Sequence, residues 1–361
     1  MWPYWVFLFF LPSFQAIFNY RSDQAFLPNK LWGPPWIAIF IFCSLMIGLR
    51  HEVGVDWGSY LTHHDDISDA INQEGFLFIS DPAYAFLNWI GAQLGFGIYF
   101  SNLVCGLVFS WGVLTFSRAQ SRPWLAMVVA IPYLVIVVAM NYSRQGVAVG
   151  IVMLALVSLE RDHLIRFGLL IALASLFHKS AAILLPLAFL TLGVRKPLWN
   201  FIWLLATGVT LFLLLLIESL ETFSTTYIEA EYASNGASVR IAMNAFPAVF
   251  FLFFRQRFQL NSNQKKLWTA LAITAIGFII ILNLSPSSTA VDRVALYLIP
   301  LQLFVWSSLP NVLAKQKALR LFWVNALVIY SAAVLFIWFS VGDFSSSWIP
   351  YQFYPWVWFW G

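Results

Sequence analysis

The chain has 361 residues, of which 61% are hydrophobic and only 10% are charged, and its formal net charge is +4. Soluble globular proteins carry about 25% charged residues, so this chain has too few charges to cover a surface that faces water. The composition therefore excludes a soluble enzyme and a nucleic-acid-binding domain, and it indicates an integral membrane protein whose basic residues lie in short loops.

Apolar segments follow one another along almost the whole chain and predict an all-α bundle of about twelve membrane-spanning helices. A spanning helix needs about 20 apolar residues, so residues 1–361 form a single membrane domain with no room for a separate soluble one. The first segment has no Lys or Arg before it and no small-residue cleavage site after it, which favours a retained span over a signal peptide. In chain order, the predicted spans are 3–18, 36–49, 98–117, 124–140, 144–159, 164–177, 180–193, 198–217, 241–254, 267–284, 292–309 and 319–340.

Two stretches between the spans are predicted to lie outside the membrane. Residues 50–97 form an external loop that ends in an interfacial or re-entrant segment from residue 84, because a full span there would break the alternation of sides. Its run His63-His64-Asp65-Asp66 matches no recognised metal-ligand spacing, which favours an acidic solvated loop. Residues 218–240 form a second external loop, rich in acids, that is solvated, covers a cavity or contacts sugar.

The basic residues are distributed unevenly between the two sides of this topology. Loops on one side hold 15 of the 20 Lys and Arg but only 3 of the 16 acids. The positive-inside rule makes this side cytoplasmic and both termini external. The helices on either side of His178 and Lys179 are about 14 residues and about 21 Å long, shorter than the ~30 Å hydrocarbon core. Their turn is therefore predicted to lie below the outer surface, where its charges need water or a partner.

The opposite side holds five basic residues, and four of these lie in polar groups at the ends of spans. The groups are Arg50-His51-Glu52 with Asp56 and Tyr60, Asn141-Tyr142-Ser143-Arg144-Gln145, His178-Lys179-Ser180, and Asp292-Arg293 with Tyr297. A single Arg at a span end can simply reach the lipid head groups, and Asp292 beside Arg293 can be a neutralising pair. Four groups on one face favour a shared external cavity for a multiply charged anion such as a lipid pyrophosphate, since Arg and Lys bind phosphate oxygens.

The aromatic C-terminal tail predicts a position at the membrane interface. Trp and Tyr recur from Trp348 to Trp360, as in the aromatic belts of membrane proteins, and stacking on sugar rings is the alternative. The sequence contains no Gly-rich phosphate loop, no His-Glu-x-x-His and no Gly-x-Ser-x-Gly. Nucleotide-binding, metalloprotease and serine-hydrolase functions therefore have no support.

The polar groups resemble the EpsG family of bacterial exopolysaccharide proteins, a branch of the Wzy-type polysaccharide polymerases. The matching features are Arg50 with Gly54, Asp56 and Tyr60; Asp81-Pro82-Ala83-Tyr84 with Asn88; Asn141 with Arg144-Gln145 and Ala148; and His178-Lys179-Ser180-Ala181, with Arg293 and Tyr297 as a weaker match. Most of them fall, in the family's order, over roughly residues 48–185, although the family more often reads Glu-Pro-Gly at Asp81-Pro82-Ala83. The fold expected is polytopic and all-α, for which a GT-C-like membrane glycosyltransferase architecture is one form.

The resemblance implies that the protein polymerises oligosaccharide repeat units carried on undecaprenyl pyrophosphate into exopolysaccharide or O-antigen. The reaction would take place at the outer face of the bacterial cytoplasmic (inner) membrane, without a nucleotide sugar, a metal or a cofactor. The expected partners are the lipid-linked glycan, the bilayer, and a chain-length regulator or other glycan-assembly proteins; nucleic acid is not expected.

The chemistry of this reaction has two requirements, and each suggests a role for particular residues. The leaving pyrophosphate develops charge that fixed cations stabilise, and the attacking hydroxyl must give its proton to a base. Asp56 is the first candidate for the base and His178 the second, although Asp56 could instead hold Arg50 in place. The cations expected to bind the pyrophosphate are Arg50, Arg144, Lys179 and Arg293, and the residues expected to position sugar or phosphate are Tyr60, Tyr142, Gln145 and Tyr297.

Three other classes of function remain open. A polysaccharide or lipid-linked-sugar transporter or flippase would use the same cavity for passage, but it should show two related halves with paired broken helices, and the sequence shows no such repeat. Another membrane transferase, such as an O-antigen ligase, and a structural subunit of an envelope complex are the remaining alternatives. Only a polymerase yields a ladder of longer chains without a nucleotide.

Overall fold

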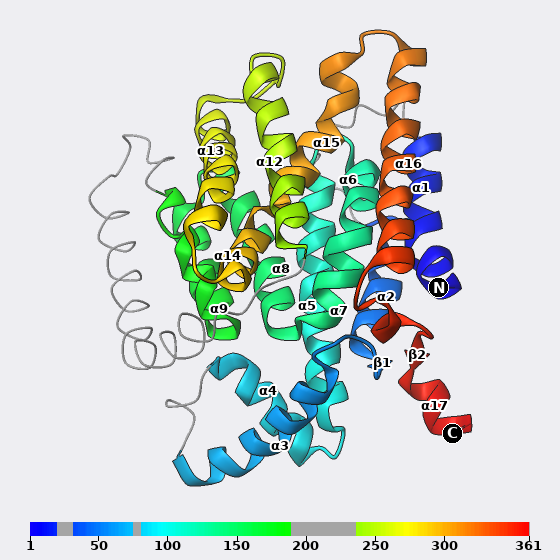
Figure 1. Cartoon of the computed structure of the whole chain (residues 1–361), viewed down its shortest axis with the longest axis vertical. Helices are drawn as coiled ribbons and strands as arrows, with labels where there is room; N and C mark the ends of the chain where they lie inside the picture. Colours follow the sequence, from blue (N-terminus) through cyan, green and yellow to red (C-terminus); the bar gives the residue numbers. More distant parts are fainter. Residues whose placement is uncertain (20–31, 75–80, 189–235, 361) are drawn as a thin grey trace.

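The computed structural model describes residues 1–19, 32–74, 81–188 and 236–360, and these residues are helical almost throughout (Figure 1). Within these ranges only two short strands occur, β1 (Arg50–His51) and β2 (Gln352–Phe353), and they pair antiparallel. The all-α bundle predicted from the sequence is therefore confirmed.

Seven helical segments in the described part of the chain are long and apolar enough to cross a membrane. They are α5 (Gly97–Ala119); α6 (Pro123–Ala130) continued by a π-helical stretch, η3 (Ile131–Val138), and α7 (Ala139–Asn141); α8 (Ser143–Glu160); α12 (Ala237–Phe254); α13 (Ser262–Leu284); α14 (Ser288–Ala295) continued by η6 (Leu296–Leu298) and α15 (Ile299–Leu313); and α16 (Lys317–Val341). Proline lies in the first turn of α6, where its missing N–H has no partner to lose. Each of the seven coincides with a predicted span.

Three shorter apolar helices match three further predicted spans. They are η1 (Tyr4–Phe10) with α1 (Leu11–Phe18), α2 (Pro34–Gly48) and α9 (Leu164–Phe177). The predicted span 180–193 begins with a 3₁₀ turn, η4 (Lys179–Leu184), and continues past the described residues, while the span 198–217 lies entirely outside them. The total of about twelve spans therefore stays a prediction.

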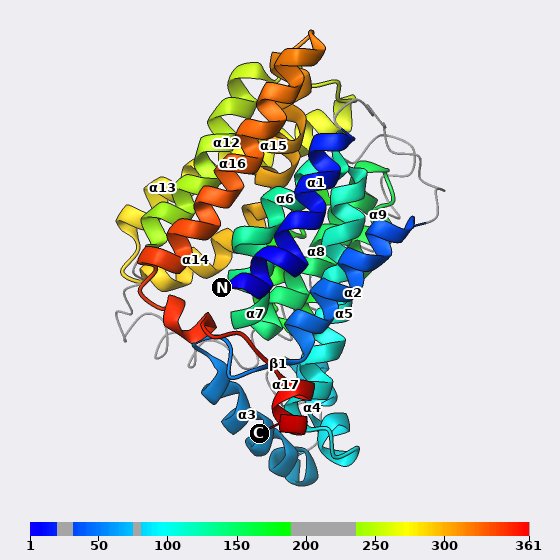
Figure 2. The ribbon, with the colours of Figure 1, turned by 90° about the vertical axis from the view of Figure 1, so that its right-hand side faces the viewer.

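Helices α2, α5, α8 and α9 pack side by side in that order, and glycine sets their close approach (Figures 1 and 2). A Cβ atom added to Gly112 of α5 would lie 2.1 Å from the carbonyl oxygen of Gly150 on α8. One added to Gly48 of α2 would lie 2.6 Å from the Cα atom of Leu103 on α5. Because lipid supplies no hydrophobic force between helices, such backbone contact is a main source of packing energy.

The second half of the bundle is built from α12 to α16, and α6 packs between it and the first half. Figure 2 shows α1, α6 and α16 together on this side of the molecule. The indole of Trp268 on α13 is fully buried, stacks on Phe304 at 4.0 Å between ring centroids, and donates a 2.8 Å hydrogen bond to Glu160 at the end of α8. This contact ties the two halves together.

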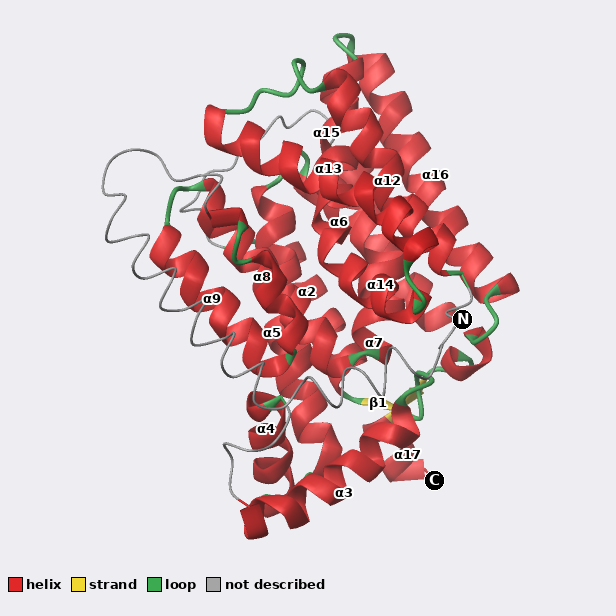
Figure 3. Cartoon of the chain, turned by 60° about the vertical axis from the view of Figure 1, so that its left-hand side comes forward, coloured by secondary structure: helices red, strands yellow, loops and turns green. Residues whose placement is uncertain are grey.

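Two helices, α3 (Trp57–Glu74) and α4 (Pro82–Gln93), lie across one end of the bundle (Figures 1 and 3). The predicted external loop 50–97 therefore contains two helices, and the run His63–Asp66 lies within α3 and not in a solvated loop. Trp57, Tyr60 and Ile67 recur at helical spacing and are all buried, which is the amphipathic period that a helix requires. At 12 residues, or about 18 Å, α4 is too short to cross a membrane.

Two further features to compare with the sequence are the second acidic loop and the possibility of a metal site. Most of the predicted acidic loop 218–240 lies outside the described residues, and its last residues, from 237, form the first turn of α12. In the part of the chain that the structure describes, no group of three or more His, Cys, Asp or Glu could hold a metal ion.

The C-terminal segment returns to the end of the bundle where α3 and α4 lie. It consists of η7 (Ser345–Trp348), β2 and α17 (Tyr354–Trp360). The indole of Trp348 is buried, and its N–H donates to the carbonyl of Ile136 at 2.9 Å. Trp356 and Trp358 are instead 68% exposed. The tail thus divides into a part that packs against the bundle and an exposed aromatic end.

Candidate active site

The polar groups singled out in the sequence come together where α3 and α4 meet the bundle. Each group lies at the end of an element, and the elements are labelled in Figures 1 and 3. The group of Asp56 precedes α3, that of Arg144 begins α8, that of His178 ends α9, and that of Arg293 ends α14. Residues from segments far apart in the chain therefore share one site.

The first ion pair of the site joins Arg144 to Asp81, the residue that precedes α4. The Arg144 guanidinium donates to the Asp81 carboxylate at 2.8 Å, and the Nδ1 atom of His178 lies 3.9 Å from the same carboxylate oxygen. Asp81 is almost completely buried, whereas the side chains of Arg144 and His178 are 33% and 23% exposed. The buried Asp81 thus contacts both Arg144 and His178, and both of these side chains still reach the solvent.

Asp81 is held in this position by an unusual backbone. Its φ of 56° and ψ of 64° lie in the left-handed region, which Asp tolerates better than most non-glycine residues. Burial raises the pKa of its carboxyl, but His178 and Arg144 outweigh that effect and hold the pKa below its usual value. Its second oxygen, Oδ1, is buried without a hydrogen-bond partner in the described residues. Asp81 is therefore an anchored anion.

The second ion pair joins Arg293 to Asp56. Their closest charged atoms lie 3.8 Å apart, and both side chains are about one-third exposed. The Arg293 guanidinium also lies over the Tyr142 ring, 3.9 Å from its centroid, which is a cation–π contact. The neutralising pair of Asp292 with Arg293 is not formed, because Asp292 instead accepts a 2.8 Å hydrogen bond from Arg240.

The loop that carries Asp56 is held by two hydrogen bonds and packs closely at Gly54. The Asn141 side chain accepts from the Asp56 backbone N–H at 3.1 Å, and the Gly54 N–H donates to the carbonyl of Ser347 at 3.0 Å. Gly54 has a φ of 101°, and a Cβ there would lie 2.8 Å from the carbonyl oxygen of Met140.

Burial raises the pKa of Asp56 above its usual value, and the charges of Arg293 and Arg144 oppose part of that shift.

Arg50 lies beneath the site and not in it. Its side chain is buried and donates to the carbonyl of Ile47, to Ser143 at 2.7 Å and to Asn102 at 3.5 Å. The space beside it leaves no room for a water molecule. In this arrangement its guanidinium is not exposed to a phosphate in the way that the sequence predicted, but holds Ser143 at the start of α8, next to Arg144.

The remaining predicted residues line the same region. The Gln145 side chain donates to the carbonyl of Arg293 at 2.6 Å, and the Tyr297 hydroxyl lies 3.1 Å from that of Ser180. Lys179 is partly buried in the same turn as Ser180. The Tyr60 ring lies under the Arg144 guanidinium, 5.9 Å from its carbon. These contacts join α8 to α14 and η4 to η6 around the two ion pairs.

Three residues of the site were not assigned a role from the sequence. Asp81 carries the first ion pair, and its only signal was its place in the Asp81-Pro82-Ala83-Tyr84 motif. Ser143 and Asn102 hold Arg50, and they share a 2.8 Å hydrogen bond with each other. Ser143 stood out only as a member of the polar group around Arg144, and small polar residues inside apolar helices are common, so the sequence does not distinguish Asn102 at all.

Comparison with known proteins gives one match. The model of the EpsG family matches residues 35–353, which includes both ion pairs and the residues around them. No curated protein and no solved structure matches the chain.

Proposed function

The chain belongs to the EpsG family of Wzy-like polysaccharide polymerases, and we propose that it joins oligosaccharide repeat units carried on undecaprenyl pyrophosphate. The family implies a glycosyltransferase-like polymerase, and the apolar helices indicate a multi-pass membrane protein. We further propose that the reaction takes place at the outer face of the bacterial cytoplasmic membrane, because 15 of the 20 Lys and Arg belong to the loops predicted on the opposite side.

The proposed reaction breaks the bond between the anomeric carbon of the growing chain and its pyrophosphate. A hydroxyl of the next lipid-linked unit attacks that carbon and forms the new glycosidic bond. The bonding electron pair leaves with the pyrophosphate, which stays on its lipid, and the hydroxyl proton passes to a base. The donor is already activated, so the reaction needs no nucleotide sugar, and protein cations can stabilise the leaving group without a metal.

One observation carries this proposal: two arginines from separate helices are each anchored by a carboxylate, the charges of both act on Asp56, and both still reach solvent. Arg144 on α8 is held by Asp81, and Arg293 on α14 is held by Asp56. A guanidinium has five N–H donors, so each can bind a phosphate oxygen while keeping its carboxylate partner. Lys179, in the turn after α9, is the third cation proposed for the pyrophosphate. Fixed cations of this kind stabilise developing charge without reorganising during the reaction.

Asp56 remains the first candidate for the base. It is partly exposed beside Arg293 and has a raised pKa, which makes it a stronger base than an ordinary carboxylate. His178 is the second candidate, since Asp81 lies within 3.9 Å of its ring and could orient it. Asp56 does not hold Arg50, whose partners are Ile47, Ser143 and Asn102.

An apolar cavity beside the site supports a lipid-linked substrate. It has a volume of about 280 Å³ and lies between η4, α13 and η6, with Ile183, Leu187, Phe278 and Tyr297 among its lining residues. Tyr297 belongs to both places, because its hydroxyl contacts Ser180 in the site. A polyprenyl chain in this cavity would place its pyrophosphate toward Arg293 and Arg144.

The decisive experiment uses purified protein in liposomes with lipid-linked repeat units as the only substrate. We expect a ladder of longer glycans without nucleotide and in the presence of EDTA. Arg144→Gln should abolish the ladder, because a neutral amide cannot stabilise the leaving charge. It should also lower the temperature of thermal unfolding, because the buried Asp81 carboxylate loses its closest cation, so the ladder is measured at a temperature at which the variant stays folded. A normal ladder from Arg144→Gln would rule out this role, and passage of the units across the bilayer without elongation would identify a transporter.

A further inference from the structure

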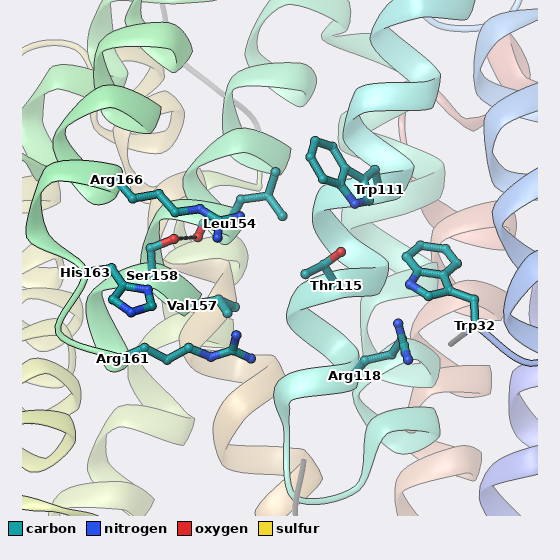
Figure 4. Close-up of a pocket in the computed structure, with 10 residues that line it drawn as sticks. All are labelled: Trp32, Trp111, Thr115, Arg118, Leu154, Val157, Ser158, Arg161, His163 and Arg166. Atoms are coloured by element: carbon teal, nitrogen blue, oxygen red, sulfur yellow. Dashed lines mark hydrogen bonds between the residues drawn. The ribbon is translucent and has the colours of Figure 1, made fainter. Parts of the chain in front are cut away.

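A cavity at the opposite end of the bundle is lined by basic and aromatic residues (Figure 4). It has a volume of about 200 Å³ and lies between α5, α8 and the start of α9. Three arginines line it, Arg118, Arg161 and Arg166, together with His163. The 18 residues of α8 separate this cavity from the site at Arg144 by about 27 Å, so it is not part of the proposed active site.

The residues that line the cavity carry positive charge, and two neighbouring acids bond to α13. Glu160 accepts its hydrogen bond from Trp268, and Asp162 accepts one from Asn263 at 2.7 Å, both on α13. None of the ten lining residues is acidic. Burial lowers the pKa of Arg161 and the charge of Arg166 lowers it further, while the adjacent Glu160 carboxylate raises it in part. Arg161 and Arg166 therefore repel each other, and an anion bound between them would relieve this repulsion.

The lining changes from apolar to basic along the helices. On α5 the lining residues Trp111, Thr115 and Arg118 follow one face at helical spacing, and on α8 Leu154 and Arg161 do the same. The Trp111 ring is 48% exposed on a helix that can span a membrane. A free phosphate would need only the basic end. A lipid would place its phosphate among the arginines and its chain along Trp111 and Leu154.

Based on this arrangement, we propose that the cavity binds the phosphodiester head group of an anionic phospholipid from the membrane leaflet on this side. Drug-sized ligands need cavities of roughly 300–1,000 Å³, and this smaller volume fits one head group. Basic cavities between membrane helices are suited to such lipids. Arg118 also lies over the ring of Trp32, 5.2 Å from its centroid, which holds the guanidinium at the edge of the cavity.

The test measures lipid binding by native mass spectrometry of the full chain. Phosphatidylglycerol is compared with phosphatidylcholine, and inorganic phosphate is added as the soluble competitor. We expect a preference for phosphatidylglycerol that millimolar phosphate does not remove. The triple variant Arg118→Gln, Arg161→Gln, Arg166→Gln should weaken phosphatidylglycerol binding about 100-fold, since each basic residue near an anionic membrane contributes a factor of about five.

Two further variants keep the result interpretable. The first is a control triple variant that removes the same charge from another loop predicted on this face: Arg255→Gln, Arg257→Gln and Lys266→Gln. It should leave phosphatidylglycerol binding unchanged. Thr115→Phe keeps every cation but fills the cavity, and it should also abolish the preference. The proposal fails if both triple variants lose binding equally, if Thr115→Phe binds normally, or if inorganic phosphate displaces the lipid.

Discussion

At the residue scale, Asp81 is placed to support the proposed site through Arg144 and His178. It occupies a left-handed backbone conformation, and its buried carboxylate faces Arg144 and His178. Asn tolerates the same conformation but carries no charge. Replacing Asp81 by Asn therefore separates the electrostatic role of this residue from its role in the backbone.

We predict that Asp81→Asn destabilises the protein by about 2–3 kcal/mol, because it leaves the partly buried Arg144 without an anion; a fully buried pair would cost roughly 3–5 kcal/mol. Polymerisation should fall strongly, since Arg144 and His178 lose their anchor. Thermal unfolding and the polymer ladder measure the two effects. Asp65→Asn, on the exposed face of α3, is the matched control and should behave as the wild type. An unchanged ladder from Asp81→Asn would contradict the anchoring role.

The pH dependence of the reaction tests Asp56 as the base. A carboxyl base works only when it is ionised, so activity should fall as the pH drops through the raised pKa of Asp56. The charge of Arg293 lowers that pKa, so Arg293→Gln should move this fall in activity to higher pH, while Arg293→Lys should leave it near its original position. The measurement is kcat/KM against pH for the residual activity. If Asp56→Asn retains the same profile, the base is His178.

The sequence predicts the site at the level of which residues carry charge, but not how they pair. Arg144, His178 and Arg293 stand out because they are ionisable groups at the ends of apolar spans on the less basic side. The enclosure of Arg50 could not be foreseen, because its partner Ser143 lies 93 positions away. The role of Asp81 depends on a backbone conformation and on a partner 63 positions away, and neither follows from residue type.

At the scale of elements, glycine determines which helices touch. We predict that Gly112→Ala lowers the free energy of unfolding by about 1–3 kcal/mol or more, because its Cβ would lie 2.1 Å from the Gly150 carbonyl oxygen and would force α5 and α8 apart. Gly168→Ala and Gly277→Ala are matched controls, since nothing lies within 4 Å of their new Cβ atoms. Each should be neutral or stabilising by up to about 1 kcal/mol. Chemical unfolding in detergent compares the three, and equal behaviour would contradict the packing argument.

The apolar runs predict the elements well wherever lipid is the solvent. Ten predicted spans correspond to helices in the described residues, because a backbone in hydrocarbon has to satisfy its hydrogen bonds within the helix. The prediction fails for α3, where acids and histidines conceal the helical period of Trp57, Tyr60 and Ile67. This helix packs against other helices at a membrane face, so its mean hydropathy does not identify it as a helix.

At the scale of the molecule, the C-terminal segment contacts the loop that carries Asp56. We predict that Trp348→Ala lowers the free energy of unfolding by about 3–5 kcal/mol, as for other buried Trp residues. It should also abolish polymerisation, because the preceding residue, Ser347, accepts the hydrogen bond that holds Gly54. Trp358→Ala removes an equally large but 68% exposed ring and should affect neither. Thermal unfolding and the polymer ladder provide the measurements. Full activity of Trp348→Ala would show that the loop holds Asp56 without the tail.

The same contact has a consequence for how the protein is made. Gly54 and Leu49 are bonded by Ser347 and Tyr354, which leave the ribosome about 290 residues later, or about 15–60 s at roughly 5–20 residues per second. During that interval the loop before α3 lacks the two bonds from the C-terminal segment, although Asn141, which holds the Asp56 N–H, is already present. We therefore expect a nascent chain that lacks the C-terminal segment to be inserted in the membrane but inactive, so that the proposed activity begins only after the final helices have been translated.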